Sequence, residues 1–320
     1  AATAKVWAIN AYGTSAPSDA SASFTPALTQ IGLFLGGGNR TNVIDKVVIT
    51  TTGNASDFGD LTVGRDYSSS VASSTRGVTA GGLQSSNPQT VNVMDYVTIA
   101  SAGDSTDFGD LLQTTYGTGG CSSSTRGVFG GGVIPNDSFI NVMQYITIAS
   151  TGNSTDFGDT LNDREGFSGC GSATRGIFFG ARYISSGSYV YENVIQYITI
   201  GSTGNSTDFG DLTAARVYSG ALSSSTRGVN GGGGYGAVNV IDYVTIASTG
   251  DASDFGDLTV TRWQLAGAAG TSRGLFGGGN SNSNVIDYIT IASTGNAQDF
   301  GDLSAGRSSV SACSNAHGGL

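Results

Sequence analysis

Pairs of aspartates on either side of Phe-Gly are the residues in this sequence most able to do chemistry. The segment Asp-Phe-Gly-Asp occurs six times, and its aspartates are Asp57 and Asp60, Asp107 and Asp110, Asp156 and Asp159, Asp208 and Asp211, Asp254 and Asp257, and Asp299 and Asp302. Two carboxylates at a fixed separation could act as the acid and base of a glycosidase, and clustered carboxylate oxygens could bind calcium. Because a reaction needs its residues only once, six copies favour a structural role, with calcium binding and catalysis as the alternatives.

Other candidates for chemistry are weaker. Asp-Phe-Gly also occurs in protein kinases, but their glycine-rich phosphate loop with its lysine, and their catalytic loop, do not occur here. The glycine run 231–234 is not followed by the Lys-Ser/Thr of a phosphate-binding loop. His317, the only histidine, has no neighbouring His or Cys with which to bind a metal. The sequence therefore predicts no catalytic residue, no metal site and no cofactor.

The six copies are regularly spaced, which indicates the elements that carry them. Their start positions 57, 107, 156, 208, 254 and 299 differ by 50, 49, 52, 46 and 45 residues. A period near fifty is typical of a radial or stacked array of one supersecondary unit. In the repeat 216–262, residues 240–246 alternate as a β-strand does, and Gly and Ser clusters separate further short strands. We predict four strands per repeat, named a, b, c and d in chain order, and no helix.

Arginines recur at fixed offsets from the aspartates. Five residues after the second aspartate of a copy stand Arg65, Arg164, Arg216, Arg262 or Arg307, and the remaining copy has Thr115. Charge-assisted pairs between the two residues, or hydrogen bonds in the turns, would tie strand d of one repeat to the next repeat. On this interpretation, replacing Asp211 with Asn is expected to lower stability by roughly 1–3 kcal/mol.

The two ends of the repeat region hold complementary parts of one repeat. The first repeat begins at strand b, residues 31–38, whereas the chain finishes with 307–314, which has the pattern of a strand a. Joining these two segments would hide the edge strands that an open sheet exposes. A linear solenoid would instead need capping repeats. We therefore predict an all-β fold for residues 27–320, a six-bladed β-propeller closed by N- and C-terminal strands in one blade.

The order of residues within a repeat resembles that of a kelch repeat. Both have an arginine before strand a, a diglycine ending strand b, a tyrosine in strand c and an aromatic in strand d, where Phe58 and its five equivalents stand in place of the usual tryptophan. The wording of the repeats, such as Tyr-Ile-Thr-Ile-Ala-Ser-Thr-Gly-Asn and Ser-Ser-Ser-Thr-Arg-Gly-Val-Phe-Gly-Gly-Gly, further resembles that of structural proteins of marine tailed phages. This resemblance implies a non-enzymatic virion component, a fibre or decoration module, made in the host cytoplasm.

The first 26 residues form a separate segment. Residues 5–18 resemble the last two strands of a fibronectin type III domain, a module that phage fibres frequently carry. So few residues cannot bury a core of their own. We therefore expect residues 1–26 to be a partial fibronectin III-like segment, and the chain to be part of a larger chain or assembly.

Composition restricts the partners. The formal net charge is −10 and the isoelectric point is near 4.3, so binding to a phosphate backbone is not expected. The sequence has no apolar run long enough to predict a membrane span. Cys121, Cys170 and Cys313 occupy a repeat position that Val71 and Leu222 fill elsewhere, which predicts buried free thiols.

The connections between strands vary most between repeats and carry the candidate binding residues. The b–c and d–a connections of an antiparallel blade emerge on the same face, and variable aromatic loops on a rigid scaffold are typical of a binding surface. The candidates are Tyr183, Tyr189, Tyr191, Tyr218, Tyr235 and Trp263. We expect this face to contact a host-surface glycan or a neighbouring virion protein; covering of the blade ends is the structural alternative.

Two further functions fit the same sequence: a secreted or cell-surface bacterial adhesin, with an extracellular location, and a glycan-active enzyme. An enzyme should bring acids that occur in only one or two blades together at a central pocket. The acids of this kind are Asp66, Asp137, Asp163, Glu165 and Glu192.

Overall fold

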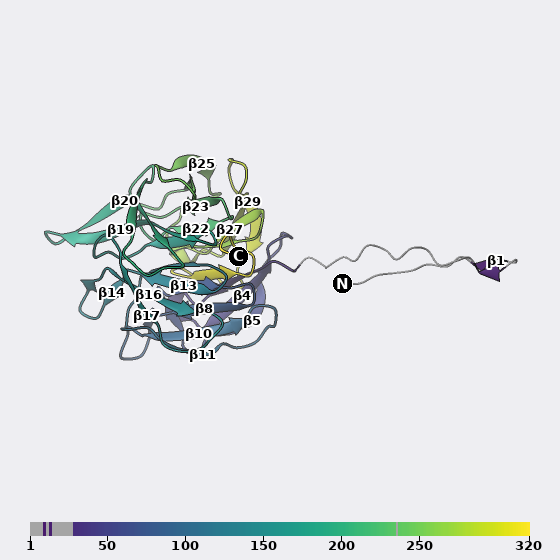
Figure 1. Cartoon of the computed structure of the whole chain (residues 1–320), viewed down its shortest axis with the longest axis horizontal. Coiled ribbons are helices and arrows are strands. Elements are labelled where there is room, and N and C mark those ends of the chain that lie inside the picture. Colours follow the sequence, from purple (N-terminus) through teal and green to yellow (C-terminus); the bar gives the residue numbers. More distant parts are fainter. Residues whose placement is uncertain (1–8, 11–12, 15–27, 235) are drawn as a thin grey trace.

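The computed structural model describes residues 9–10, 13–14, 28–234 and 236–320. The fibronectin III-like interpretation of residues 1–26 therefore lies outside the described residues, apart from the paired two-residue strands β1 (Ile9–Asn10) and β2 (Gly13–Thr14). The candidate Tyr235 also lies outside them. From residue 28 onwards the chain forms one ring of sheets (Figure 1).

Six four-stranded antiparallel sheets make up this ring, each running from strand a at the centre to strand d at the rim. Blade 1 is β30 (Ser311–Ser314), β3 (Ile31–Leu35), β4 (Val43–Val48) and β5 (Ser56–Asp60). Blade 2 is β7 (Ser69–Ala72), β8 (Arg76–Ala80), β10 (Val93–Thr98) and β11 (Thr106–Asp110). Blade 3 is β12 (Gly119–Ser122), β13 (Arg126–Gly130), β16 (Val142–Thr147) and β17 (Thr155–Asp159).

The remaining blades follow the same order. Blade 4 is β18 (Ser168–Gly171), β19 (Arg175–Ser185), β20 (Ser188–Thr199) and β21 (Thr207–Asp211). Blade 5 is β22 (Gly220–Ser223), β23 (Arg227–Gly231), β24 (Val240–Thr245) and β25 (Ser253–Asp257). Blade 6 is β26 (Ala266–Ala269), β27 (Arg273–Gly277), β28 (Val285–Thr290) and β29 (Gln298–Asp302).

Short elements decorate one face of the ring. β6 (Arg65–Asp66) pairs with β9 (Leu83–Gln84), and β14 (Val133–Ile134) pairs with β15 (Ser138–Phe139). The 3-10 turns η1 (Gly38–Arg40) and η2 (Asn280–Asn282) lie in two b–c connections. Because β6 belongs to a d–a connection and β9 to a b–c connection, both kinds of connection share this face. No helix in the described ranges is long and apolar enough to cross a membrane.

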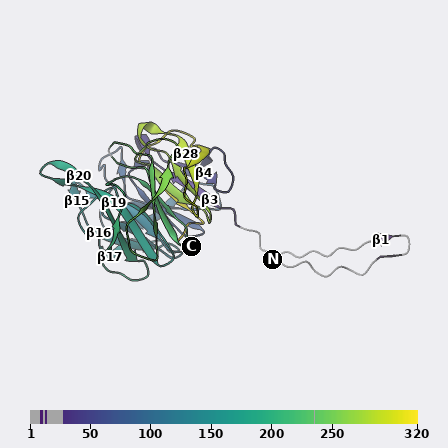
Figure 2. The ribbon, with the colours of Figure 1, turned by 90° about the horizontal axis from the view of Figure 1, so that it is seen from above.

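The ring closes as predicted, as a six-bladed propeller. β30 pairs with β3 in blade 1, with Cys313 opposite Leu33, so the last strand completes the blade that the first strands began. Figure 2 shows the same ring from above. The three cysteines are buried and free, as expected, and burial raises the pKa of Cys313 to about 12.

In five of the six blades, one tyrosine of strand c packs against the phenylalanine of strand d inside the blade. In blade 2 the ring of Tyr96 meets Phe108 edge-on at a centroid distance of 6.1 Å, while the guanidinium of Arg76 lies 4.2 Å above its centroid. Arg76 also donates from Nη1 to the carbonyl oxygen of Ile148 in blade 3, at 3.0 Å. The strand-b arginines thus fix the tyrosine of their own blade and hold the next blade.

The repeated Asp-Phe-Gly-Asp segment is a clasp between blades. In blade 1, Phe58 is buried, its carbonyl oxygen accepts from the N–H of Gly103 in blade 2 at 2.7 Å, and the N–H of Asp60 donates to the side chain of Asp104 at 3.0 Å. A Cβ on Gly59 would lie 2.4 Å from the Gly103 carbonyl oxygen, so only glycine permits this approach. The same pair of bonds joins every blade to the next around the ring.

The predicted pairing of these aspartates with the arginines is wrong. Strand d is the outermost strand, so both carboxylates of each copy lie at least partly in solvent, and none of the ion pairs in the described residues includes one of them. Charged side chains on edge strands oppose edge-to-edge association of sheets. The place of the twelve carboxylates on the outermost strands fits this role.

The arginines pair instead with aspartates of strand c in the following blade. Arg262 donates to Asp287 at 2.5 Å, with both side chains buried. The equivalent pairs are Arg65 with Asp95, Arg216 with Asp242, and Arg307 with Asp45. The interblade tie was predicted correctly, but its acid belongs to strand c.

Two blades replace this ion pair by a neutral set. Gln144 and Gln196 stand where the other blades have aspartate, and Thr115 stands at the arginine position that precedes Gln144. Oε1 of Gln144 accepts from the N–H of Leu112 and the hydroxyl of Ser154, at 2.8 and 2.7 Å. Arg164, which precedes Gln196, leaves the buried site and binds Glu192 instead.

Deletion of residues 307–320 tests the closure. It removes strand a of blade 1 and exposes the edge of β3, so we expect aggregation or loss of a single cooperative melting transition. The check is calorimetry combined with size-exclusion chromatography. A monomeric deletion variant with unchanged melting would show that the shared blade does not hold the ring.

Arg216 permits a direct comparison of the two candidate acids. Asp242→Asn leaves a buried guanidinium without its counter-charge, which should cost about 3 kcal/mol or more. Asp211→Asn changes an exposed side chain and should stay within about 0.5 kcal/mol of the unmodified protein. Urea denaturation measures both, and a larger loss for Asp211→Asn than for Asp242→Asn would contradict the assignment.

Candidate functional site

The central channel begins at a closed ring of six backbone hydrogen bonds. One residue from each d–a connection adopts a left-handed conformation there, and its N–H donates to the carbonyl oxygen of its counterpart in the preceding connection, at 2.7–3.1 Å. In order, the residues are Tyr67, Gly117, Gly166, Tyr218, Gln264 and Ser309. The hydrogen bonds of this ring occupy the N–H and carbonyl groups of these six residues. A ligand at this mouth would therefore contact side chains.

The opposite end of the channel is covered by the C-terminal tail. Nε2 of His317 lies 2.9 Å from the carbonyl oxygen of Ala72 in blade 2, while the N–H of Gly318 donates to Ser223 in blade 5 at 3.0 Å. Blades 2 and 5 are opposite each other, so the tail crosses the channel. Burial lowers the pKa of His317, and Nδ1 accepts from the N–H of Gly319 at 3.1 Å, which fits a neutral imidazole.

Little space is left between the two ends. The cavity below the mouth has a volume of about 110 Å³ and walls of mainly Gly, Ser and Ala. Sites for drug-sized ligands typically measure about 300–1,000 Å³. A ligand of this size would therefore have to lie on the face of the ring.

Two tyrosines meet over the mouth. Tyr67 and Tyr218 occupy opposite positions of the hydrogen-bonded ring, yet their ring centroids are only 5.3 Å apart in an edge-to-face contact. Gln264 donates to the hydroxyl of Tyr67. Tyr116 packs edge-on against Tyr67 at 6.1 Å, and Trp263 lies 6.1 Å from Tyr218. Left-handed conformations are unfavourable for residues other than glycine, and their concentration at one place is typical of functional sites.

A buried carboxylate anchors this aromatic cluster. Glu165 accepts from the hydroxyl of Tyr218 at 2.6 Å and from Nε of Arg182 at 2.8 Å. Burial, together with Glu165 beside it, raises the pKa of Tyr218 well above its ordinary value, so the hydroxyl keeps its proton and donates. Gly166 makes room for the ring of Tyr218, since a Cβ there would lie 3.2 Å from Cε1 of Tyr218.

The long hairpin formed by β19 and β20 projects from the ring beside the mouth (Figure 1). Arg182 pairs with Tyr191, and Ile184 with Tyr189, so these four side chains share one side of the hairpin. Because Arg182 reaches Glu165 and Tyr218, this side faces the mouth. The guanidinium of Arg182 lies 4.0 Å from the ring centroid of Tyr189, whose side chain is 49% exposed.

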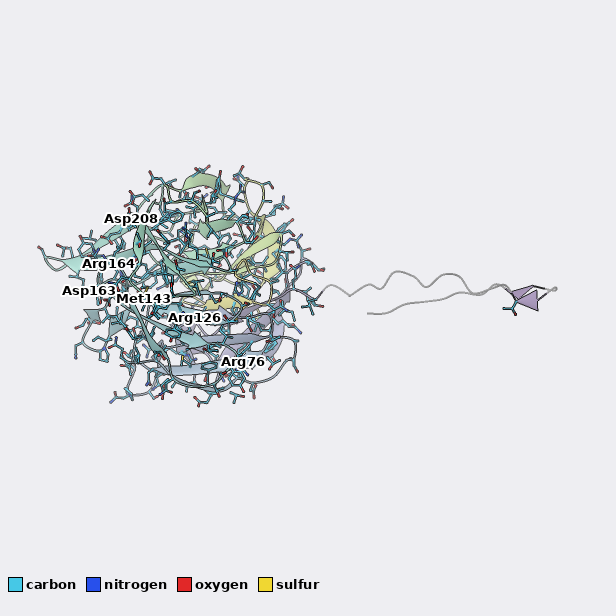
Figure 3. The ribbon with its side chains drawn as sticks, in the orientation of Figure 1. Arg76, Arg126, Met143, Asp163, Arg164 and Asp208 are labelled. Atoms are coloured by element: carbon cyan, nitrogen blue, oxygen red, sulfur yellow. The ribbon has the colours of Figure 1, made fainter. Side chains whose placement is uncertain are left out.

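Tyr183 lies on the other side of the hairpin. It pairs with Val190, and the guanidinium of Arg164 lies 3.8 Å from its ring centroid. Arg164 also holds Glu192 with two hydrogen bonds, at 2.6 and 3.0 Å. Figure 3 labels Arg164 on the flank of the molecule from which the hairpin projects. The hairpin thus separates Tyr183 from Tyr189, Tyr191 and Tyr218.

Several residues at the mouth were not among the binding candidates from the sequence, although Glu165 was considered as a catalytic acid. They are Tyr67, Tyr116, Glu165, Arg182 and Gln264. Each stands at a position that varies between the repeats, which is the signal that could have identified them. Their convergence also needs the left-handed ring, and its non-glycine members give no pattern in the sequence.

The single-blade acids do not form a pair of free carboxylates. Glu165 and Glu192 are bound to Arg182 and Arg164, and Asp66 lies 3.8 Å from Arg40. Burial raises the pKa of Asp66 to about 6, against the lowering effect of Arg40. Within the described part of the chain, no group of three or more His, Cys, Asp or Glu is placed to hold a metal ion.

Comparison with known proteins adds no further assignment. No protein-family model matches the chain, and the search of curated proteins finds no similar sequence.

Proposed function

We propose that this chain is a non-enzymatic binding module that uses the face around the channel mouth to contact a host-surface glycan or a neighbouring protein. The observation that supports this proposal most strongly is that unrepeated aromatic side chains gather on one face of a scaffold that otherwise repeats six times. The aromatic residues are Tyr67, Tyr116, Tyr189, Tyr218 and Trp263. Propeller folds suit such contacts, since their loops are carried by a rigid framework.

The mouth is held rigid before any ligand arrives. Tyr218 is fixed by Glu165, Tyr67 by Gln264, and Tyr189 by the stacked guanidinium of Arg182. Tyrosines offer a large contact area at low entropic cost, and a preorganised surface loses less freedom on binding. The small cavity and the arginine-bound acids likewise support binding over turnover.

We place this module on a tailed-phage particle, as a fibre or decoration protein made in the host cytoplasm. The support is the kelch-like order of the repeats, their likeness to structural proteins of marine phages and the fibronectin III-like residues 1–26. Mass spectrometry of purified particles should find the chain among the virion proteins. Its absence from the particles would refute the location and leave the binding face untouched.

Alanine at Tyr189, Tyr191 and Trp263 together tests the binding face. These residues lie on the mouth face, and alanine keeps the backbone hydrogen bonds that close the ring, so the fold should persist. We expect particles that carry the triple variant to lose adsorption to the host or to fail in assembly. The measurement is adsorption and particle yield, with the melting temperature of the purified chain as the control.

Particles that bear all three changes and still assemble and adsorb normally would contradict the proposal. In that case the functional contact lies on another face of the propeller.

A further inference from the structure

The proposed binding face contains a corner between two surfaces. The floor is the tyrosine pair over the mouth, Tyr67 and Tyr218, and the wall is the mouth-facing side of the hairpin with Arg182 and Tyr189. The guanidinium of Arg182 lies at the junction, 5.1 Å from the ring centroid of Tyr218 and 4.0 Å from that of Tyr189. Flat rings thus stand on two sides of one polar group.

The charges of the corner cancel. Arg182 is paired with Glu165 at 2.8 Å, and the nearby aspartates Asp66 and Asp137 add negative charge to the same face. The chain as a whole carries a formal net charge of −10. An anionic ligand would be repelled by this field and would find no unpaired cation in the corner.

The polar groups of the corner suit hydroxyl groups. The guanidinium of Arg182, which buried Glu165 holds in place, forms strong directional hydrogen bonds, and the tyrosine hydroxyls and Gln264 can donate or accept. A neutral hexose presents both kinds of surface that such a corner matches: hydroxyls around its edge and a flat C–H face that packs on an aromatic ring. Pockets of this composition, aromatic with a few placed polar groups, are typical of small-ligand sites.

The extent of the corner argues against a protein partner. Stable protein interfaces bury about 1,200–2,000 Å² in total, with about 20–30 residues on each side. Here Tyr189 is the most exposed aromatic side chain, whereas Tyr67, Tyr218 and Trp263 are half-buried. The corner thus exposes one tyrosine ring and parts of three other rings, which suits a small ligand better than a protein surface.

The geometry points to a neutral, hexose-containing glycan as the ligand of this corner, with Tyr189 as the stacking residue. The Arg182 guanidinium, held in place by buried Glu165, binds sugar hydroxyls together with Gln264 and the tyrosine hydroxyls. This inference rests on the proposed function and narrows it from a glycan or a protein to one chemical class.

Titration calorimetry of the complete chain with hexasaccharides tests it. The probes are neutral hexasaccharides of glucose, mannose and galactose, and hexagalacturonate as the anionic one. We expect at least one neutral probe to bind, with an affinity nearly independent of salt between about 50 and about 500 mM because no charge is paired across the contact. Tyr189→Ala should weaken binding about tenfold or more.

Tyr183→Ala is the matched control, because Tyr183 belongs to the same hairpin but faces away from the corner. It should bind like the unmodified chain, and Tyr189→Phe should retain most of the affinity because it keeps the ring. Tighter binding of hexagalacturonate, binding of none of the neutral probes, or an equal loss in Tyr183→Ala would overturn the inference.

The outcome separates this inference from the proposed function. If no hexasaccharide binds but particles with the triple alanine variant fail to assemble, the face is a protein contact; the proposed function stands and the glycan assignment falls. If no hexasaccharide binds and those particles also assemble and adsorb normally, both fall.

Discussion

The hydrogen bonds by which each blade holds the next are the constraint on which the rest of this structure depends. They form closed circuits: one around the channel mouth, through residues such as Tyr67 and Ser309, and one around the rim, through Phe58 and Gly103. Around the rim every link has the same geometry, and each includes a glycine at which a Cβ would collide with the next turn, so each rim link demands the same residue types. This gives a structural reason for the six copies of Asp-Phe-Gly-Asp and of the Gly-Asn or Gly-Asp turns.

Departures from the repeat then fall into two kinds. Some are compensated within the scaffold: Gln144 replaces an aspartate, and Leu112, Thr115 and Ser154 change with it, so the buried site stays satisfied. Other departures from the repeat take no part in the hydrogen bonds that join the blades. Glu165 and Arg182 occur in one blade only and serve each other and the aromatic cluster. The second kind marks the face that we propose for binding.

The sequence predicts the repeat architecture well because period, strand pattern and complementary ends all reflect local rules. Blade number, closure through β30 and β3, and buried free cysteines were obtained in this way. The aspartate that pairs with each arginine was harder to predict. Asp211 and Asp242 are equally repeated, and only the position of their strands, d at the rim and c inside, decides which one meets Arg216.

The side of the hairpin on which a residue lies could not be predicted from the sequence pattern. The register of β19 against β20 shifts between Phe179 and Ala181, and such a shift reverses the side to which every later residue points. Tyr183 and Tyr189 lie on opposite sides for a second reason: the turn pairs Ser185 with Ser188, which places Tyr189 opposite Ile184 and not opposite Tyr183. Most of the mouth cluster was missed for a related reason, since it assembles from five d–a connections far apart in the chain.

The central claim is that repeated residues build the fold whereas unrepeated residues of one face carry the function. Replacing residues 184–189 with Asn-Gly tests it most directly, because Tyr183 and Val190 are opposite each other and a two-residue turn can join them. This replacement removes Tyr189 but keeps Arg182, so buried Glu165 stays paired. The measurement is the melting temperature of this variant beside the adsorption of particles that carry it. The account predicts a propeller that still melts cooperatively near the temperature of the unmodified chain, and particles that no longer adsorb. A variant that fails to fold, or one whose particles adsorb normally, would contradict it.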